Sequence, residues 1–383
     1  MKKTKNILLK TFLLIVFISF LLVNVFGQSK FNSEWDNTYK FSSDDGQFKL
    51  KFGGRLMTDW AIFSQDDSME SNFGELKPGA EFRKIWFYNS GQIYNNIKYK
   101  VQLSFDGGEV VLKDVFIEMT DIPLLGNIRF GHFKEPFRFD VITSSKNVLF
   151  MENSLHTGFA NTRSTGVMIH NNFLDKKISF QTGVFFNSDK QGNPLNSYDY
   201  NFTSRLTALA FVNENKTKYL HLGSSYSLRI IDDVYNIKSK PESHLCNTYL
   251  NTNDIDFISN LNLIGTEAYL VLGSFSFQSE YTISSVDRGT KDDYSFSALY
   301  GQVGFYLTGE HKSYKSALSP VGRTYPKNNV GNGKNGIGAW ELALRYSSID
   351  LNSKDIKGGK LHDIAMGVNW YLNPATKIIA NYI

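Results

Sequence analysis

Hydrophobic and polar residues alternate one by one along much of this chain, most clearly between residues 96 and 119. In the first half of this segment the apolar positions are Ile97, Tyr99, Val101, Leu103 and Phe105, and the polar positions between them are Lys98, Lys100, Gln102, Ser104 and Asp106. The turn signal Asp106-Gly107-Gly108 follows before the alternation resumes. A period of two predicts extended strands, because successive side chains of a strand point to opposite faces of a sheet.

The same pattern recurs from Phe48 to the end of the chain and predicts fifteen strands. Strands of about ten residues with one apolar and one polar face are long enough to cross a bilayer when tilted. We predict them near residues 48–63, 81–93, 96–106, 110–119, 127–133, 164–172, 177–186, 200–212, 218–229, 264–273, 275–285, 296–308, 337–349, 361–373 and 376–383, and leave a short strand at 254–261 open.

The connections between these strands alternate between tight and long. The long ones are 64–80, 134–163, 187–199, 230–253, 286–295 and 309–336. Short turns at one rim and long loops at the other are typical of outer-membrane barrels. The sequence therefore predicts an all-β protein, a transmembrane antiparallel β-barrel of about 16 strands. Residues 376–383 begin a strand that has no closing partner, so we expect the last strand to be missing from this chain.

The first 27 residues have the composition of a secretory signal peptide. Four lysines precede an apolar run from Phe12 to Val23, and Val25-Phe26-Gly27 supplies a cleavage site. The alternative, a membrane anchor, would need roughly 20 apolar residues, and this run is shorter. We expect residues 1–27 to be removed, residues 28–46 to be a polar, irregular leader segment, and residues 47–383 to form the barrel in a bacterial outer membrane.

Composition narrows the function further. The four lysines before residue 11 account for the whole net charge of +4, so the remaining chain is balanced and gives no sign of nucleic-acid binding. Aromatic residues make up 15% of the chain, which suits a wall with a lipid-facing side and aromatic girdles. Cys246 is the single cysteine, which excludes a disulfide framework and a thiolate metal site.

Eight segments resemble the phosphate-selective porin O and P family, and in order they cover most of the chain after the leader. They are residues 53–56 (GGRL), 81–84 (EFRK), 128–137 (IRFGHFKEPF), 143–145 (TSS), 150–155 (FMENSL), 307–314 (LTGEHKSY), 338–347 (GAWELALRYS) and 369–374 (NWYLNP). The resemblance implies a homotrimeric, 16-stranded porin in outer-membrane lipid whose long third loop folds into the channel and narrows it. It also implies small anions such as phosphate or polyphosphate as the transported solutes.

By this resemblance residues 134–163 would be the constricting loop. Its cations, which we take as candidates for anion binding at the constriction, are Lys134, Arg138, Lys146 and Arg163. Lysine and arginine hold phosphate through charge-assisted hydrogen bonds, and rings of them select anions in pores. Glu135, Asp140 and Glu152 lie in the same loop, so the reading that these are ordinary solvated loop charges stays open.

Six further cations on the predicted strands lie opposite the apolar faces and are expected to point into the lumen. They are Arg83, Lys98, Lys100, Arg205, Arg229 and Arg345. On the lipid face near the midplane each would cost about 2–4 kcal/mol. Carboxylates share these faces, so two interpretations remain: selection of anions, or bracing of the wall by ion pairs.

Four other interpretations compete with a selective channel. The chain contains no H-E-x-x-H or G-x-S-x-G motif, and its seven histidines are scattered, so we expect no enzyme, no metal site and no cofactor. The G-x-G-x-x-G match at 331–336 precedes a strand within an Asn/Gly-rich loop and is read as a flexible loop. A general, non-selective porin and a soluble secreted β-rich binding protein remain as alternatives, because alternation alone does not tell which face is inside.

Overall fold

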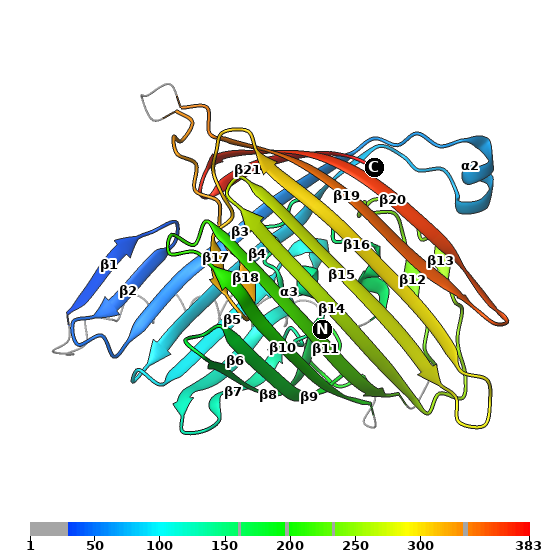
Figure 1. Ribbon diagram of the computed structural model, residues 1–383, viewed down its shortest axis with the longest axis horizontal. Helices are drawn as coiled ribbons and strands as arrows, with labels where there is room; N and C mark the ends of the chain where they lie inside the picture. Colours follow the sequence, from blue (N-terminus) through cyan, green and yellow to red (C-terminus); the bar gives the residue numbers. More distant parts are fainter. Residues whose placement is uncertain (1–29, 160–161, 196–198, 232–233, 332–335) are drawn as a thin grey trace, which may run out of the picture.

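The computed structural model describes residues 30–159, 162–195, 199–231, 234–331 and 336–383 (Figure 1). The predicted signal peptide and most of the 331–336 motif lie outside these residues. Within them, one antiparallel sheet of 17 strands contains all the long strands, and each strand pairs with the next one along the chain. The strands are β1 (Phe31–Trp35), β2 (Tyr39–Ser43), β3 (Lys49–Ala61), β4 (Gly79–Ile93), β5 (Ile97–Ser104), β6 (Val111–Ile122), β7 (Gly126–Phe133), β8 (Ser164–Phe173), β9 (Ile178–Phe186), β10 (Tyr200–Val212), β11 (Lys218–Ile230), β14 (Asn260–Leu272), β15 (Phe275–Asp287), β16 (Tyr294–Tyr306), β19 (Ala339–Ser353), β20 (Ile356–Asn373) and β21 (Thr376–Tyr382).

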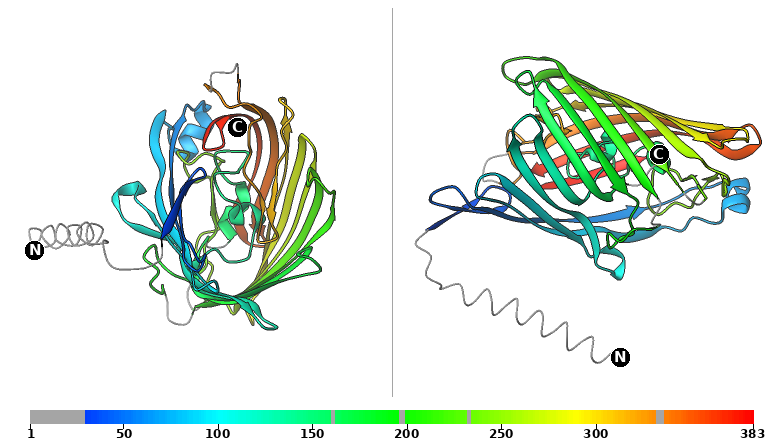
Figure 2. Two further views of the ribbon diagram at one scale, coloured as in Figure 1. Left: turned by 90° about the vertical axis from the view of Figure 1, so that its left-hand side faces the viewer. Right: turned by 90° about the horizontal axis from the view of Figure 1, so that it is seen from below.

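All fifteen predicted strands are present, as the series from β3 to β21 in this sheet. The sheet curls into a barrel (Figure 2). Among the described residues, β21 pairs only with β20, and residues 53–61 of β3 pair only with β4. The doubtful strand at 254–261 is an isolated bridge at Ile255, followed by the start of β14.

The apolar faces of the strands point outward and the polar faces inward. On β19 the outer residues Leu342, Leu344 and Tyr346 are 43–46% exposed, whereas Glu341 and Arg345 on the other face are at most 4% exposed. This sidedness is the reverse of that of a soluble protein and fits a wall in lipid. At the tight-turn rim the Trp340 and Trp370 rings stack at 5.0 Å between centroids, as in an aromatic girdle.

One predicted long loop lies at the rim opposite to the expected one. Consecutive strands are antiparallel, so connections lie alternately at the two rims. The connection between β16 and β19, residues 307–338, is therefore at the rim of the tight turns 94–96, 174–177 and 273–274. This loop carries the short strands β17 (Tyr314–Ser316) and β18 (Ser319–Val321), which pair with each other. Conversely, the connection between β19 and β20 at the other rim is only two residues long. Loop length alone therefore does not identify the rim.

Residues 28–46, expected to be irregular, contain the β1–β2 hairpin from residue 31 to residue 43. The hairpin pairs with the first residues of β3 and extends the sheet beyond the tight-turn rim (Figure 1). Alternation over five residues was too short to predict these strands.

Little helix is present. The helices are α2 (Asp67–Phe73), η1 (Asp106–Gly108), α3 (Phe139–Ile142) and η2 (Leu155–Phe159), and a second short hairpin joins β12 (Lys238–Ser239) to β13 (Leu250–Asn251). None of the helices in the described ranges is long and apolar enough to cross a membrane.

Candidate functional site

Residues 134–163 are called the constriction loop from here on, after their predicted role. Their described part, which includes α3 and η2, lies inside the ring of strands (Figure 2). The loop contacts inner faces all around the wall. Arg83 on β4 forms two hydrogen bonds to the Glu152 carboxylate at 2.6 and 3.1 Å, and Asn369 on β20 donates to the Leu149 carbonyl at 3.0 Å. At the loop's base, the Glu135 carboxylate accepts from Arg229 on β11 at 2.6 Å. These contacts fix the loop across the interior.

A cavity of about 570 Å³ lies between this loop, the wall formed by β3, β4 and β5, and the loop 307–338. Six cationic side chains line it, against one carboxylate, that of Asp36. The cations are Lys51 and Arg55 from β3, Lys100 from β5, Lys146 from the constriction loop, and Lys315 and Arg323 from loop 307–338.

Most of this positive charge is not balanced by ion pairs. In the described part of the chain, only Lys100 among the six forms an ion pair, with Asp114 at 2.6 Å. Asp36 is itself paired with Lys40 at 2.5 Å. Burial and the neighbouring Arg55 and Arg323 lower the pKa of Lys146 to about 8. The cavity is therefore electropositive, and its cations repel one another until an anion enters.

Arg55 connects the wall of the cavity to the constriction loop. Its guanidinium carbon lies 4.5 Å from the centroid of the Trp86 ring, and it donates a hydrogen bond to Ser145 of the constriction loop. Its Nε is buried without a hydrogen-bond partner among the described residues. Arg163 lies 5.7 Å from the same ring.

Of the four cations predicted for the constriction, the structure places only Lys146 in the cavity. Lys134 donates to the loop's own carbonyls at Val141 and Thr143. Arg138 is 2% exposed and donates to the His156 carbonyl at 3.3 Å, so it does not reach the cavity. Arg163 pairs with Asp114 at 2.8 Å, beside Lys100.

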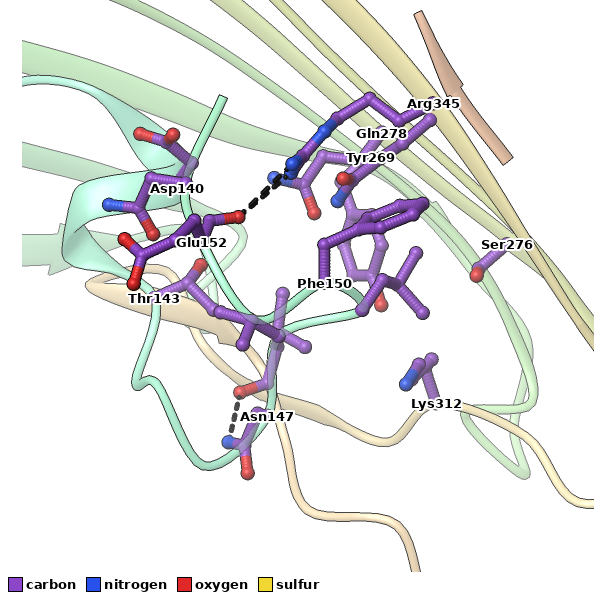
Figure 3. A pocket seen from close by; sticks show the side chains of 15 residues that line it. Asp140, Thr143, Asn147, Phe150, Glu152, Tyr269, Ser276, Gln278, Lys312 and Arg345 are labelled. Atoms are coloured by element: carbon purple, nitrogen blue, oxygen red, sulfur yellow. Dashed lines mark hydrogen bonds between the residues drawn. The ribbon is translucent and has the colours of Figure 1, made fainter. Parts of the chain in front are cut away.

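Of the six cations predicted to face the lumen from the wall, the structure likewise places only one in the cavity. Lys100 lines the cavity, Lys98 is exposed near the tight-turn rim, and Arg83 binds Glu152. Arg205, Arg229 and Arg345 are buried in ion pairs with Glu267, Glu135 and Glu242, respectively. Figure 3 shows Arg345 reaching the Glu152 carbonyl, to which it donates at 3.1 Å. These three arginines brace the wall and the loops.

Four cavity cations were not predicted from the sequence. Lys51 and Arg55 could have been found, because they share one face of a predicted strand and Arg55 lies within a family-like segment. Lys315 and Arg323 carry no such signal, since nothing in a long loop tells that it folds inward.

The meander of amphipathic strands, the outward apolar faces and the polar interior crossed by a loop define an outer-membrane β-barrel porin. The profile of the phosphate-selective porin O and P family matches residues 48–383, and the chain belongs to this family. Among relatives, Porin O of Pseudomonas aeruginosa is 25% identical over 380 residues, covering 89% of this chain and 84% of that protein.

Solved structures show the same fold at low sequence identity. The trimer form of OmpT from Vibrio cholerae superposes with a TM-score of 0.54 at 10% identity, covering 87% of each chain. The anion-selective porin of Comamonas acidovorans gives a TM-score of 0.52 at 12% identity, again with 87% of each chain covered.

Proposed function

We propose that this protein is a passive channel for small anions, with phosphate or polyphosphate preferred, and that it assembles as a homotrimer in outer-membrane lipid. The observation that carries this proposal is the electropositive cavity, in which six cations face one carboxylate. The family and the shared fold of the anion-selective porin of Comamonas acidovorans support the same assignment.

The cavity offers a phosphate group what it loses when it leaves water. Ammonium and guanidinium groups replace hydration with charge-assisted hydrogen bonds, and Arg55 adds a planar fork that matches phosphate oxygens. Hydroxyl groups of Ser144, Tyr88 and Ser313 line the same space. Because the cations stand on separate elements, an anion can exchange partners stepwise, which keeps binding weak enough for release.

The experiment is reconstitution of the full chain in planar bilayers under a potassium chloride gradient. The reversal potential is expected to show anion preference. Added phosphate is expected to reduce the chloride current relative to phosphate-free controls of equal ionic strength. A reversal potential of the opposite sign would refute anion selection. Anion preference without any phosphate block would leave a general anion porin.

The cavity can be tested separately from the fold. Lys315→Gln is expected to raise the phosphate concentration for half-block by about tenfold, as the loss of one charge-assisted hydrogen bond costs about 1.5 kcal/mol or more. Lys357→Gln, which removes an exposed lysine at the opposite rim, is the matched control and should behave as wild type.

The trimer is proposed from the family resemblance and from the trimer form recorded for OmpT. Light scattering of the detergent-solubilised protein, corrected for bound detergent, is expected to give three chains per particle. A monomer at micromolar concentration would contradict this part of the proposal and leave the cavity argument untouched.

A further inference from the structure

A buried cluster of three side chains joins both arms of the constriction loop to the wall. Asp140 on α3, His156 on η2 and Glu280 on β15 each offer one possible ligand atom, and these atoms all lie within 4.8 Å of one another. The residues are 7%, 1% and 3% exposed. We propose that the cluster binds a divalent transition-metal ion such as Zn²⁺, which anchors the constriction loop to the barrel.

The hydrogen bonds around the cluster orient the histidine. Ser154 Oγ lies 3.1 Å from Asp140 Oδ2 and 2.6 Å from His156 Nδ1. A hydroxyl group has a single proton, so if Ser154 donates to the carboxylate it accepts from the Nδ1–H of the imidazole. Nε2 then faces the two carboxylates. Fixing one ring nitrogen in this way is how proteins prepare the other for a metal.

The distances at Nε2 fit shared coordination better than direct hydrogen bonding. His156 Nε2 lies 3.8 Å from Asp140 Oδ1 and 3.5 Å from Glu280 Oε1, and among the described residues neither Nε2 nor Asp140 Oδ1 has a hydrogen-bond partner. A protonated Nε2 would close on a carboxylate to about 2.7–2.9 Å. Two ligands at about 2.1 Å from one tetrahedral ion lie about 3.4 Å apart, close to the observed spacing.

The remaining atoms of Glu280 are held in place for this role. Its Oε2 accepts from the Asp140 amide and the Tyr300 hydroxyl, both at 2.9 Å, and its Oε1 accepts from the Phe139 amide at 2.5 Å. Each carboxylate oxygen has two lone pairs, so Oε1 keeps one that is free for a cation. Backbone and hydroxyl donors of this kind fix the orientation of metal-ligating carboxylates.

The charges in the cluster also call for a cation. The charge of the Arg138 guanidinium acts on both carboxylates, and Glu135 and Arg229 add one further charge of each sign nearby. One negative charge in the interior is thus unbalanced while the imidazole is neutral, and a buried charge of this kind is costly. One imidazole and two carboxylate oxygens suit Zn²⁺ and related ions, whereas Ca²⁺ takes six to eight oxygen ligands.

The test uses the full chain, purified from outer membranes in detergent without a metal-affinity tag and stripped with a chelator. Co²⁺, which replaces Zn²⁺ and absorbs visible light when coordinated, is titrated into the stripped protein. The wild type is expected to give absorption bands that saturate at one equivalent. Asp140→Asn and His156→Gln are expected to bind at least tenfold more weakly.

His221→Gln is the matched control. His221 is also buried beside a glutamate, with its Nε2 2.9 Å from Glu267 Oε1, but it is not part of the Asp140–His156–Glu280 cluster. It should bind Co²⁺ as the wild type does. Absence of bands from the wild type at saturating Co²⁺ would overturn the proposal even if the variants fail to fold. Equal binding by folded His156→Gln would overturn it as well, and neither result depends on the anion that the channel prefers.

Discussion

At the scale of single residues, the selectivity of the cavity is expected to depend on where each cation is held, and Arg55 is held by an aromatic ring and a hydroxyl group. Its guanidinium stacks on Trp86, whose indole N–H donates to Asp106 at 3.0 Å. Lys84 and Lys113 also lie 5–6 Å from this ring. The ring face thus stabilises like charges that would otherwise repel one another.

Arg55→Gln is expected to raise the phosphate concentration for half-block of the chloride current by about tenfold or more. Arg55→Lys keeps the charge but loses the fork and the stacking, so it should recover only part of the affinity. For both variants, the phosphate concentration for half-block is measured in single channels. Full recovery with lysine would show that charge alone matters at this position.

Lys146 is expected to make anion binding dependent on pH. Burial and neighbouring cations lower its pKa to about 8, so the ammonium is present below that pH and lost above it. Sulfate keeps its charge over this range, and its affinity is therefore expected to fall between pH 7 and pH 9. Lys146→Arg should remove most of this dependence, because a guanidinium stays charged. An unchanged slope in that variant would assign the effect to another group.

The face of a strand on which a residue lies could be predicted from the sequence, but the partner that its side chain contacts could not. Alternation predicts that Arg205 and Arg345 point inward, and in the structure both side chains are buried in ion pairs. Whether an inward arginine meets a solute or a carboxylate depends on Glu267 and Glu242, which are 62 and 103 residues away along the chain. That pairing is set by packing, which no local pattern records.

At the scale of elements, contacts at the base of the constriction loop hold the loop in position. Glu135 is 2% exposed and accepts hydrogen bonds from Ser164, Asn201, Thr203 and Arg229, which come from β8, β10 and β11. This carboxylate is the point at which the loop is joined to three strands.

Glu135→Gln is expected to destabilise the fold by about 3 kcal/mol, because the buried Arg229 would lose its counter-charge. The change is measured by urea unfolding in detergent or by the temperature at which the folded band disappears on gels. Glu214→Gln, at an exposed position, is the control and should change stability little. Equal stability of the two variants would mean that the Glu135 contacts contribute little.

Strand existence followed from alternation, whereas irregularities within strands did not. The register between β3 and β4 shifts between Met57 and Thr58, so Arg83 is an extra residue on β4. As a result the consecutive Arg83 and Lys84 both contact interior groups, Glu152 and Trp86. A strict period of two assigns such neighbours to opposite faces, and a β-bulge breaks that rule.

At the scale of the whole molecule, the apolar outer face of the barrel is expected to contact lipid. Ile364, near the middle of β20, is 59% exposed on the outer face. Ile364→Arg is expected to reduce the free energy of unfolding, measured in phospholipid vesicles, by about 2–4 kcal/mol, the cost of a cation at the bilayer midplane. Ile62 lies beyond the end of β3 and is 89% exposed, so Ile62→Arg should reduce the stability much less. A reversed order would place the membrane elsewhere on the barrel.

Loop 307–338 leaves the barrel at the tight-turn rim, and it brings Lys315 and Arg323 to the cavity. We therefore expect the two entrances of the channel to differ, with more fixed positive charge reached from the rim of this loop than from the other. Such a pore should act as a partial diode: in symmetrical salt, current through a singly inserted channel should differ in size when the voltage is reversed. Neutralising Lys315 and Arg323 together should make that current–voltage curve straighter.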